Sequence, residues 1–294
     1  MNVLETVADF YHTQPFVRRY VIPFLGCAIV YFAYRKSREF EWHAIQNTAA
    51  TIVIFWANLG LIFLFFDEIS AGLLAIYDWL QVPMMDPAIW DNVPFWLAVI
   101  FGIVIKDFIY YWCHRLMHST WGWPAHAAHH SDTHVNAFTA YRIHFIEYFL
   151  NTCAYFLLLT WLQIPETIPF VVMLTALHDQ YLHMDVPFTH GPFKILIASP
   201  AYHRWHHADV PEAYGKNLAN IMPIWDRMFG THYTYDVVPD EVPMGAVKTG
   251  IEDKNPLMIY AYPILEWSRL VRNTFRGRSA KADLSACLHK VPTE

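Results

Sequence analysis

Charged residues are scarce in this sequence, and their scarcity excludes several classes of protein. Asp, Glu, Lys and Arg make up 16% of the 294 residues, whereas roughly 25% is usual in a soluble domain. The net charge of −6 and the lack of a basic run with interleaved aromatics argue against a nucleic-acid partner. The four cysteines are far apart and form no Cys-x-x-Cys, which excludes a disulfide framework and a thiolate zinc site.

Targeting and redox motifs are missing as well. Residues 1–15 contain no Lys or Arg, so they lack the positive start of a secretory signal, and we expect internal membrane segments to direct insertion. The sequence holds no Gly-x-Gly-x-x-Gly, the motif of flavin and nicotinamide folds, and no His-Pro-Gly-Gly haem motif. Electrons for any redox reaction are therefore expected from a separate protein.

Long apolar blocks are what the sequence has in place of charge. A membrane-spanning helix needs about 20 mostly apolar residues, and hydrophobic residues make up 55% of the chain. We expect spans or near-spans at residues 17–34, 47–66, 94–113, 145–164 and 167–182, while residues 71–80 are too short to cross. The sequence thus predicts an all-α integral membrane protein with about four to five transmembrane helices and a cytoplasmic helical cap.

The orientation follows from the loop charges. Arg35, Lys36 and Arg38 follow the first block, whereas residues 67–93 carry five acids and no Lys or Arg. Cytoplasmic loops are enriched in basic residues, so the first of these loops is expected inside and the second outside. Following the predicted spans onward places the histidine-rich segments on the cytoplasmic side of a multi-pass protein.

Histidines are concentrated in one part of the chain. Thirteen of the seventeen lie between His114 and His207, and eight of these form one His-x-x-x-His and two His-x-x-His-His clusters. Residues three and four apart share a helix face, and neutral imidazole is the commonest metal ligand. Eight imidazoles exceed the ligands of one tetrahedral ion, so the pattern predicts two ions. Iron, zinc and copper all accept such ligands.

Motifs around these clusters resemble a known family. They are Asp107-x-x-x-Tyr111-x-x-His114, Arg142-x-His144-x-x-Glu147, Ser199-Pro200-x-x-His203-x-x-His206-His207 and Trp225-Asp226-x-x-Phe229-Gly230-Thr231. Over about residues 95–235 the chain resembles the integral-membrane fatty acid hydroxylase and sterol desaturase superfamily. The resemblance implies a histidine-rich di-iron site that uses dioxygen to hydroxylate a lipid C–H bond, or to desaturate it.

The resemblance also implies roles for individual residues. The metal ligands carried over by position are His114, His118, His126, His129, His130, His203, His206 and His207, with His183 and His178 expected from the hairpin before the last cluster. Four residues, Asp107, His144, Glu147 and Asp226, are expected to orient ligating imidazoles through hydrogen bonds. Whether His178 and His144 themselves bind metal stays open at this point.

The domain organisation and the partners complete the expectations. Residues 1–93 are expected to form an N-terminal transmembrane region, residues 94–235 the catalytic domain, and residues 236–294 a membrane-surface segment and tail. The partners are a lipid substrate, the bilayer, and a separate ferredoxin or cytochrome with its reductase. The compact length favours a bacterial inner membrane. A membrane metal transporter or metal-binding protein is the alternative from a different class.

Overall fold

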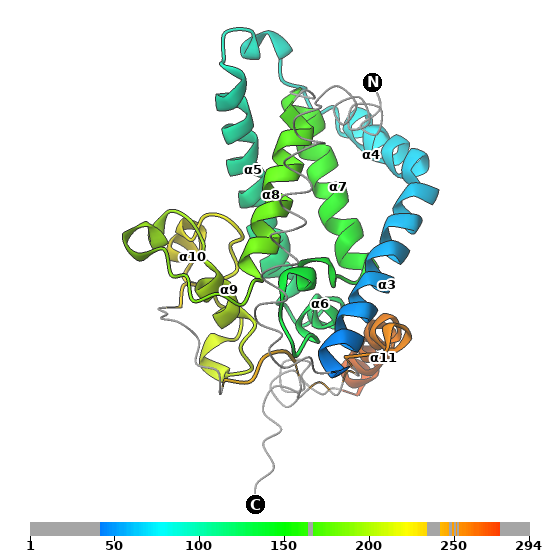
Figure 1. Ribbon diagram of the computed structural model, residues 1–294. Coiled ribbons are helices and arrows are strands. Elements are labelled where there is room, and N and C mark those ends of the chain that lie inside the picture. Colours follow the sequence, from blue (N-terminus) through cyan, green and yellow to red (C-terminus); the bar gives the residue numbers. More distant parts are fainter. Residues whose placement is uncertain are drawn as a thin grey trace, which may run out of the picture.

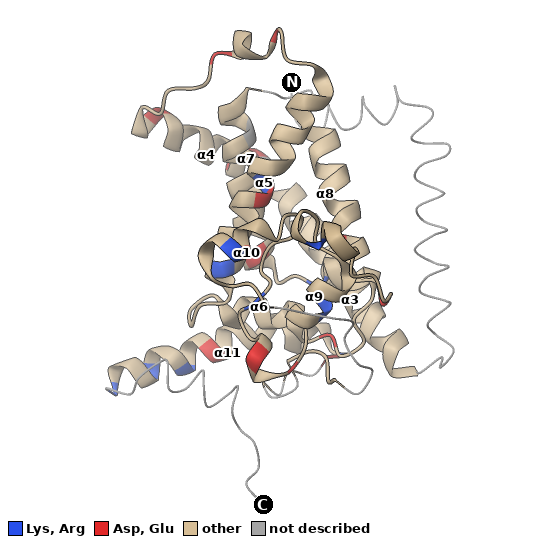
Figure 2. Cartoon of the chain, turned by 90° about the vertical axis from the view of Figure 1, so that its left-hand side faces the viewer, with Lys and Arg blue, Asp and Glu red and all other residues tan. Residues whose placement is uncertain are grey.

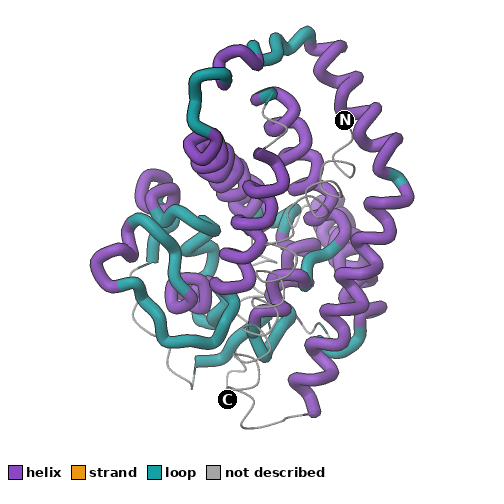
Figure 3. The backbone as a smooth tube through the Cα atoms, turned by 45° about the horizontal axis from the view of Figure 1, so that its top comes forward, coloured by secondary structure: helices purple, strands orange, loops and turns teal. Residues whose placement is uncertain are grey.

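The structure, a computed structural model, describes residues 42–163, 167–233, 242–246, 249, 251 and 253–276. Within these residues the fold is all-α, as expected, apart from an isolated β-bridge between Ala208 and Met244. Figure 3 shows helices and connecting loops, with no strand in the part of the chain that is described.

Most of the long helices form one end of the molecule, while most of the short helices and the last long helix gather at the other (Figure 1). The longer helices are α3 (Trp42–Leu64), α4 (Phe66–Leu80), α5 (Phe95–Met117), α7 (Phe145–Leu162), α8 (Ile168–Leu182) and α11 (Pro256–Phe275). The shorter ones are η2 (Pro87–Trp90), α6 (Trp123–His130), η3 (Ala137–Tyr141), η5 (Gly191–Ile195), α9 (Pro200–His206), η6 (Pro211–Ala213) and α10 (Ile224–Phe229).

Three described helices, α3, α5 and α7, are long and apolar enough to cross a membrane. They correspond to the predicted blocks at residues 47–66, 94–113 and 145–164. The block at residues 167–182 forms α8, whose 15 residues fall short of the usual span. Residues 71–80 lie within α4, and the block at residues 17–34 lies outside the described residues.

The outer surfaces of the long helices are apolar. On α5, Trp96 and Ile100 are more than half exposed, and on α3, Trp56 is 63% exposed. Exposed apolar surface on this scale marks a contact with lipid or protein. Figure 2 shows that charged residues are few on these helices, whereas Lys and Arg gather along one end of α11.

The turn between α5 and α6 depends on a glycine. A Cβ atom at Gly122 would lie 2.2 Å from the carbonyl oxygen of Leu116 and 2.6 Å from the Cα atom of Met117. Only glycine therefore allows the chain to double back this closely onto the end of α5. The close turn brings the histidines of α6 beside those of α5.

The start of α9 is fixed by its own sequence. The Ser199 side chain caps the helix by accepting a hydrogen bond from the backbone of Tyr202, and Pro200 occupies the first turn. Both residues are favoured at these positions because they satisfy or remove unpaired N–H groups. The cap sets the register that points His203, His206 and His207 into the interior.

A fully buried arginine joins the short helices to the long ones. The Arg142 guanidinium donates hydrogen bonds to the Ser131 hydroxyl at 2.9 Å, the Asn47 carbonyl at 3.2 Å and the Asp253 carbonyl. These partners belong to the end of α6, to α3 and to the segment before α11. A buried charge is tolerated when hydrogen bonds satisfy it, so Arg142 holds these three parts together.

Candidate metal centre

Nine histidines converge in two groups where the long helices meet the short ones. In each group, one potential ligand atom per residue lies within 4.8 Å of the others. The five-histidine group consists of His114, His118, His126, His130 and His206, and the four-histidine group consists of His129, His183, His203 and His207. All eight histidines of the three sequence clusters are included, together with His183.

The two His-x-x-His-His clusters divide between the groups, which the spacing alone did not reveal. In α6, His126 and His130 join the five-histidine group, while His129 joins the four-histidine group. In α9 and its cap the assignment is reversed: His203 and His207 join the four-histidine group, and His206 joins the other. Residues four apart share a helix face, so the first and last histidine of each cluster join the same group. The middle histidine points away from them and joins the other group.

The four-histidine group has the spacing of a metal site. The Nε2 atom of His183 lies 2.9 Å from that of His203, 3.2 Å from that of His207 and 3.3 Å from that of His129. An ion held about 2.1 Å from each nitrogen keeps neighbouring ligand atoms about 3.0–3.4 Å apart. The observed separations match this range, so the four imidazoles fit one transition-metal ion.

The five-histidine group is arranged in a similar way. The Nε2 atoms of His114 and His126 are 3.0 Å apart. The Nε2 atoms of His118, His130 and His206 are buried and have no hydrogen-bond partner among the described residues. Buried nitrogens rarely go unpaired, and a bound ion would satisfy all three.

The two groups are direct neighbours. The ring centres of His130 and His207, one from each group, are 4.6 Å apart, and those of His126 and His129 are 5.3 Å apart. Two ions held by these groups would therefore lie side by side, within one buried assembly of imidazoles.

Backbone carbonyl groups orient several of the imidazoles. The Nδ1 atoms of His114, His183 and His206 donate to the carbonyl oxygens of Leu218, Asp179 and Lys216 at 2.6, 2.7 and 2.8 Å. A carbonyl oxygen only accepts, so Nδ1 carries the proton and Nε2 keeps the lone pair that a metal requires. Nothing in the side chains of Leu218 or Lys216 could have indicated this role.

Burial keeps the imidazoles neutral. Desolvation first, and neighbouring imidazoles second, hold the pKa of His130 and His207 well below the ordinary value. Burial lowers the pKa of His183 to about 4 despite its bond to the Asp179 backbone, and it lowers the pKa of His206 to about 4 as well. Neutral imidazole is the form that binds metal, so the site is ready for ligation at neutral pH.

Glu147 is the one carboxylate that reaches a clustered histidine in the way the sequence suggested. Its two oxygens accept from the Nδ1 atom of His126 at 3.0 and 2.9 Å. Asp226 acts more indirectly. Its carboxylate accepts from the backbone of Leu218 at 2.8 Å and of Ala219 at 2.9 Å, and so fixes the carbonyl that holds His114.

The other predicted orienting residues lie elsewhere. Asp107 contacts no clustered histidine; it accepts from the backbone of Ile221 at 2.8 Å and of Met222 at 2.9 Å and so anchors the loop before α10. His144 caps α7 by accepting from the backbone of Ile146. Neither side chain has a hydrogen bond to a clustered histidine among the described residues, since Asp107 binds a loop far away in the sequence and His144 binds the start of its own helix.

His178 is the expected ligand that the structure does not bring to the centre. It belongs to neither histidine group. Its position five residues before His183 places it on a different face of α8. Its Nε2 atom is buried and has no hydrogen-bond partner among the described residues.

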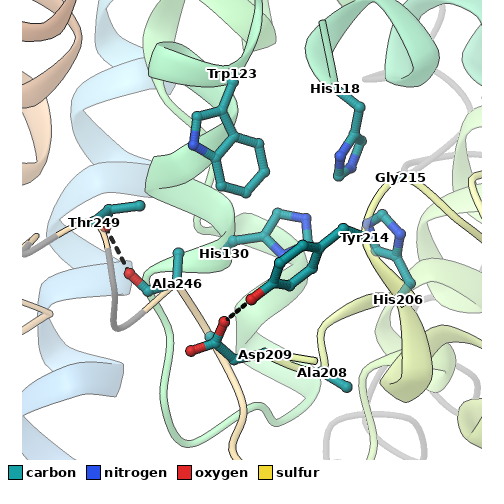
Figure 4. A pocket seen from close by; sticks show the side chains of 11 residues that line it. His118, Trp123, His130, His206, Ala208, Asp209, Tyr214, Gly215, Ala246 and Thr249 are labelled. Atoms are coloured by element: carbon teal, nitrogen blue, oxygen red, sulfur yellow. Dashed lines mark hydrogen bonds between the residues drawn. The ribbon is translucent and has the colours of Figure 1, made fainter. Parts of the chain in front are cut away.

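A pocket opens onto the five-histidine group (Figure 4). It has a volume of about 210 Å³, and the lining includes His118, His130 and His206, with Trp123 and Tyr214. The Tyr214 hydroxyl donates to Asp209, which also lines the pocket. Pockets for drug-sized ligands are about 300 Å³ or more, so this pocket suits small molecules such as water or dioxygen. No pattern in the sequence indicated this pocket.

A third cluster lies apart from both groups. The His43 Nε2 atom is 2.7 Å from a carboxylate oxygen of Asp253, which also accepts from Thr133 at 2.6 Å. His134 stacks nearby, with its ring centre 4.9 Å from that of His43. The cluster links the start of α3 to the segment before α11, and none of its members belongs to the two histidine groups.

Known proteins are similar to about half of this chain. An alkylglycerol monooxygenase of Danio rerio is 31% identical over 183 residues, which cover 57% of this chain and 40% of that protein. The ornithine lipid hydroxylase OlsE of Rhizobium tropici is 30% identical over 145 residues, covering 49% of this chain and 44% of that protein. A very-long-chain aldehyde decarbonylase of Oryza sativa subsp. japonica is 26% identical over 141 residues, covering 42% of this chain and 21% of that protein.

The chain thus spans less than half the length of these relatives. No solved structure is significantly similar to it. The family model described as fatty acid hydroxylase matches residues 99–231, a range that contains all nine histidines of the two groups. The histidine centre therefore lies in the part of the chain that is similar to the fatty acid hydroxylase family.

Proposed function

We propose that this protein is a membrane-bound di-iron oxygenase that hydroxylates a C–H bond of a lipid. The observation that carries the proposal is the convergence of nine neutral histidines, eight of them buried and His118 partly so, in two adjacent groups at one end of apolar helices. Relatives named as an alkylglycerol monooxygenase and an ornithine lipid hydroxylase support hydroxylation over desaturation. Lipids of these two kinds are the first substrates to test.

Iron bound by the two groups would activate dioxygen, so that one oxygen atom enters the lipid and the other leaves as water. The reaction consumes two electrons and two protons for each dioxygen molecule. We propose nine ligands, namely the five-histidine and four-histidine groups, without His178.

The residues of the chain divide the remaining tasks. Hydrogen bonds hold four imidazoles in the metal-binding tautomer. Three are accepted by the backbone carbonyls of Leu218, Lys216 and Asp179, and the fourth by the carboxylate of Glu147. The pocket beside the five-histidine group gives small molecules a path to the centre. The lipid would approach from the other side, along the apolar helices that lead to the histidines.

The membrane arrangement is part of the proposal. We place the histidine centre on the cytoplasmic side of a bacterial inner membrane, in a catalytic domain of residues 94–235 that is flanked by residues 1–93 and 236–294. We assign α3, α5 and α7 as spans, within the expected total of about four to five. Helix α11, with apolar Leu257 and Leu265 exposed, would lie on the membrane surface.

Electrons would come from a separate ferredoxin or cytochrome with its reductase. The basic end of α11 is a candidate docking surface, because Arg272 and Arg276 lie in its last turn and cap. A chain truncated after Ser268 should accept electrons more slowly from the donor. An unchanged rate would exclude this surface.

Metal transport is disfavoured by the same geometry. Transporters bind their cargo near the bilayer midplane, on a path between its two faces. Here α6 and α9, the helices that supply both histidine groups with ligands, lie at one end of the long helices (Figure 1).

Lipid analysis tests the proposed function directly. Lipids from cells with and without the protein would be compared by mass after growth under ¹⁸O-labelled dioxygen. We expect one lipid class to gain one labelled oxygen atom, and only in cells that contain the protein. Loss of two hydrogens without added oxygen would indicate desaturation, and no change in any lipid would contradict the proposal.

A further inference from the structure

Polar side chains follow each other at intervals of four residues along three apolar helices. Such residues share a helix face and advance about 6 Å per step. Each row ends at the metal centre: α5 and α8 end in ligands, and α7 ends in the carboxylate that holds His126. The rows are Lys106, Tyr110 and His114 on α5; Thr175, Asp179 and His183 on α8 and its cap; and Tyr155, Asn151 and Glu147 on α7.

Contacts of Lys106 show that the three rows face one another. The Lys106 ammonium donates a hydrogen bond to the Thr175 hydroxyl and lies 4.6 Å from the centre of the Tyr155 ring. Lys106 is 9% exposed, so a charged side chain is buried between three helices at membrane depth. Ionisable residues in such positions are costly and are usually functional.

Two hydrogen-bond acceptors in these rows have no partner. The Asn151 Oδ1 and Asp179 Oδ1 atoms are buried and unpaired within the described part of the chain. Asp179 Oδ1 lies 3.6 Å from the Nδ1 atom of His183, and this distance is too long for a hydrogen bond. The proton on that Nδ1 atom is already donated to the Asp179 backbone carbonyl. An unsatisfied polar atom is expensive in an apolar environment, and both atoms are one helical step from a residue of the metal centre.

The chemistry of these atoms defines what they would bind. Carboxylate and amide oxygens accept hydrogen bonds, so a ligand must bring a donor, which is a hydroxyl or an amide N–H. A charged ligand at this depth would be unfavourable, because ionisable groups are costly within a membrane. A hydrocarbon chain, an ether or a simple ester offers no donor. The ligand is therefore an uncharged group that carries O–H or N–H.

We propose that Lys106, Asn151 and Asp179 form a binding site for a hydroxyl or amide group of the lipid substrate, one to two helical turns from the metal centre. The proposal rests on the proposed function, because it assumes that a lipid approaches between α5, α7 and α8. It extends that function by naming the substrate class: a lipid with a hydrogen-bond donor close to the carbon that is oxidised.

A pair of matched lipids tests this site. Hexadecane-1,2-diol carries two donors, and 1,2-dimethoxyhexadecane has the same chain and none. The iron-loaded full-length protein, in nanodiscs containing equal amounts of both, would be captured and its retained lipids measured by mass spectrometry. We expect the wild type to retain the diol about tenfold over the diether, as one or two hydrogen bonds would give.

Two substitutions and one control localise the effect. Asn151→Leu removes an acceptor at nearly constant volume, and Lys106→Met removes the ammonium. Both should reduce the preference to below about threefold and leave the iron content unchanged. Thr152→Val is the control, since this hydroxyl on the same helix donates to the Tyr148 carbonyl of its own helix; it should keep the full preference. If Lys106→Met does not fold, Asn151→Leu carries the test.

The outcomes separate this proposal from the proposed function. Equal retention of diol and diether by the wild type would mean that the site holds only water, and would overturn the proposal. So would an undiminished preference in Asn151→Leu. A tenfold preference without oxygen incorporation into any lipid would support the site and contradict the proposed oxygenase activity.

Discussion

The two histidine groups share α6 and α9, with α5 completing one and α8 the other, and they differ in access and in support. The five-histidine group borders a pocket through His118, His130 and His206, whereas no member of the four-histidine group lines it. Three rings of the five-histidine group have an oxygen partner at Nδ1. In the four-histidine group only His183 does, and the Nδ1 atoms of His129, His203 and His207 have none among the described residues.

This difference suggests a division of labour. Water and dioxygen would reach the five-histidine group through the pocket. Hydrogen bonds at Nδ1 would keep its imidazoles in place while these molecules enter and leave. The ion in the four-histidine group would be enclosed, with packing alone orienting most of its ligands. The predictions that follow test this contrast.

Removing one ligand from each group should have the largest effect. His206 and His207 are adjacent in sequence but belong to different groups, so His206→Ala and His207→Ala form a matched pair. Each variant should bind about one iron instead of two and lose at least about 100-fold in activity. Metal analysis and lipid turnover measure both effects. If either variant still bound two ions and kept full turnover, the substituted histidine would not be a metal ligand.

Acid should destabilise the metal-free protein. The ordinary histidine pKa is 6.5, and burial lowers that of His183 and His206 to about 4. Between these values the unfolded chain binds protons that the folded chain does not, so stability is full above about pH 6.5 and falls as the pH drops toward 4. Each such imidazole contributes up to about 1.4 kcal/mol per pH unit. Thermal unfolding from pH 7.5 to 5 measures this, and a melting temperature independent of pH would contradict it.

Chelation should distinguish the groups by rate. A small chelator can enter the pocket beside the five-histidine group, so iron should leave in a fast and a slow phase. His206→Ala should remove the fast phase and His207→Ala the slow one. Stopped-flow absorbance of the chelator complex would follow both. A single phase in the wild type would show that the two groups are equally accessible.

Glu147→Gln should weaken the five-histidine group alone. The carboxylate holds His126 through Nδ1, and loss of such a partner typically costs 10–100-fold in metal affinity. Competitive titration with a metal buffer would show one weakened site and one unchanged site. Equal weakening of both sites would mean that the groups do not bind independently.

His178→Gln should have the smallest effect. His178 lies outside both groups, so two ions should remain bound with unchanged affinity. Iron content measured beside the ligand variants provides the comparison. Loss of one ion would return His178 to the set of ligands.

Sequence patterns predicted the outline of this arrangement because they depend on local spacing. The apolar blocks at residues 47–66, 94–113 and 145–164 became α3, α5 and α7, and all eight histidines of the three clusters lie in the centre. Helical periodicity fixes which residues share a face, and that is enough to place His114 with His118 and His126 with His130.

Contacts between distant segments could not be read in this way. The division of His126-x-x-His129-His130 between two groups depends on where α9 packs, and the support of His114 and His206 comes from backbone carbonyls. Asp107 has the right spacing for a role beside His114, but its carboxylate meets the loop before α10. Lys106 does carry a local signal, since a charge within an apolar block is rarely accidental.

Anomalous scattering at the iron absorption edge, from crystals of the iron-loaded protein, would test the central claim most directly. The account predicts two iron peaks for each chain, one among His114, His118, His126, His130 and His206, and one among His129, His183, His203 and His207. A single peak, or a peak away from either group, would contradict it.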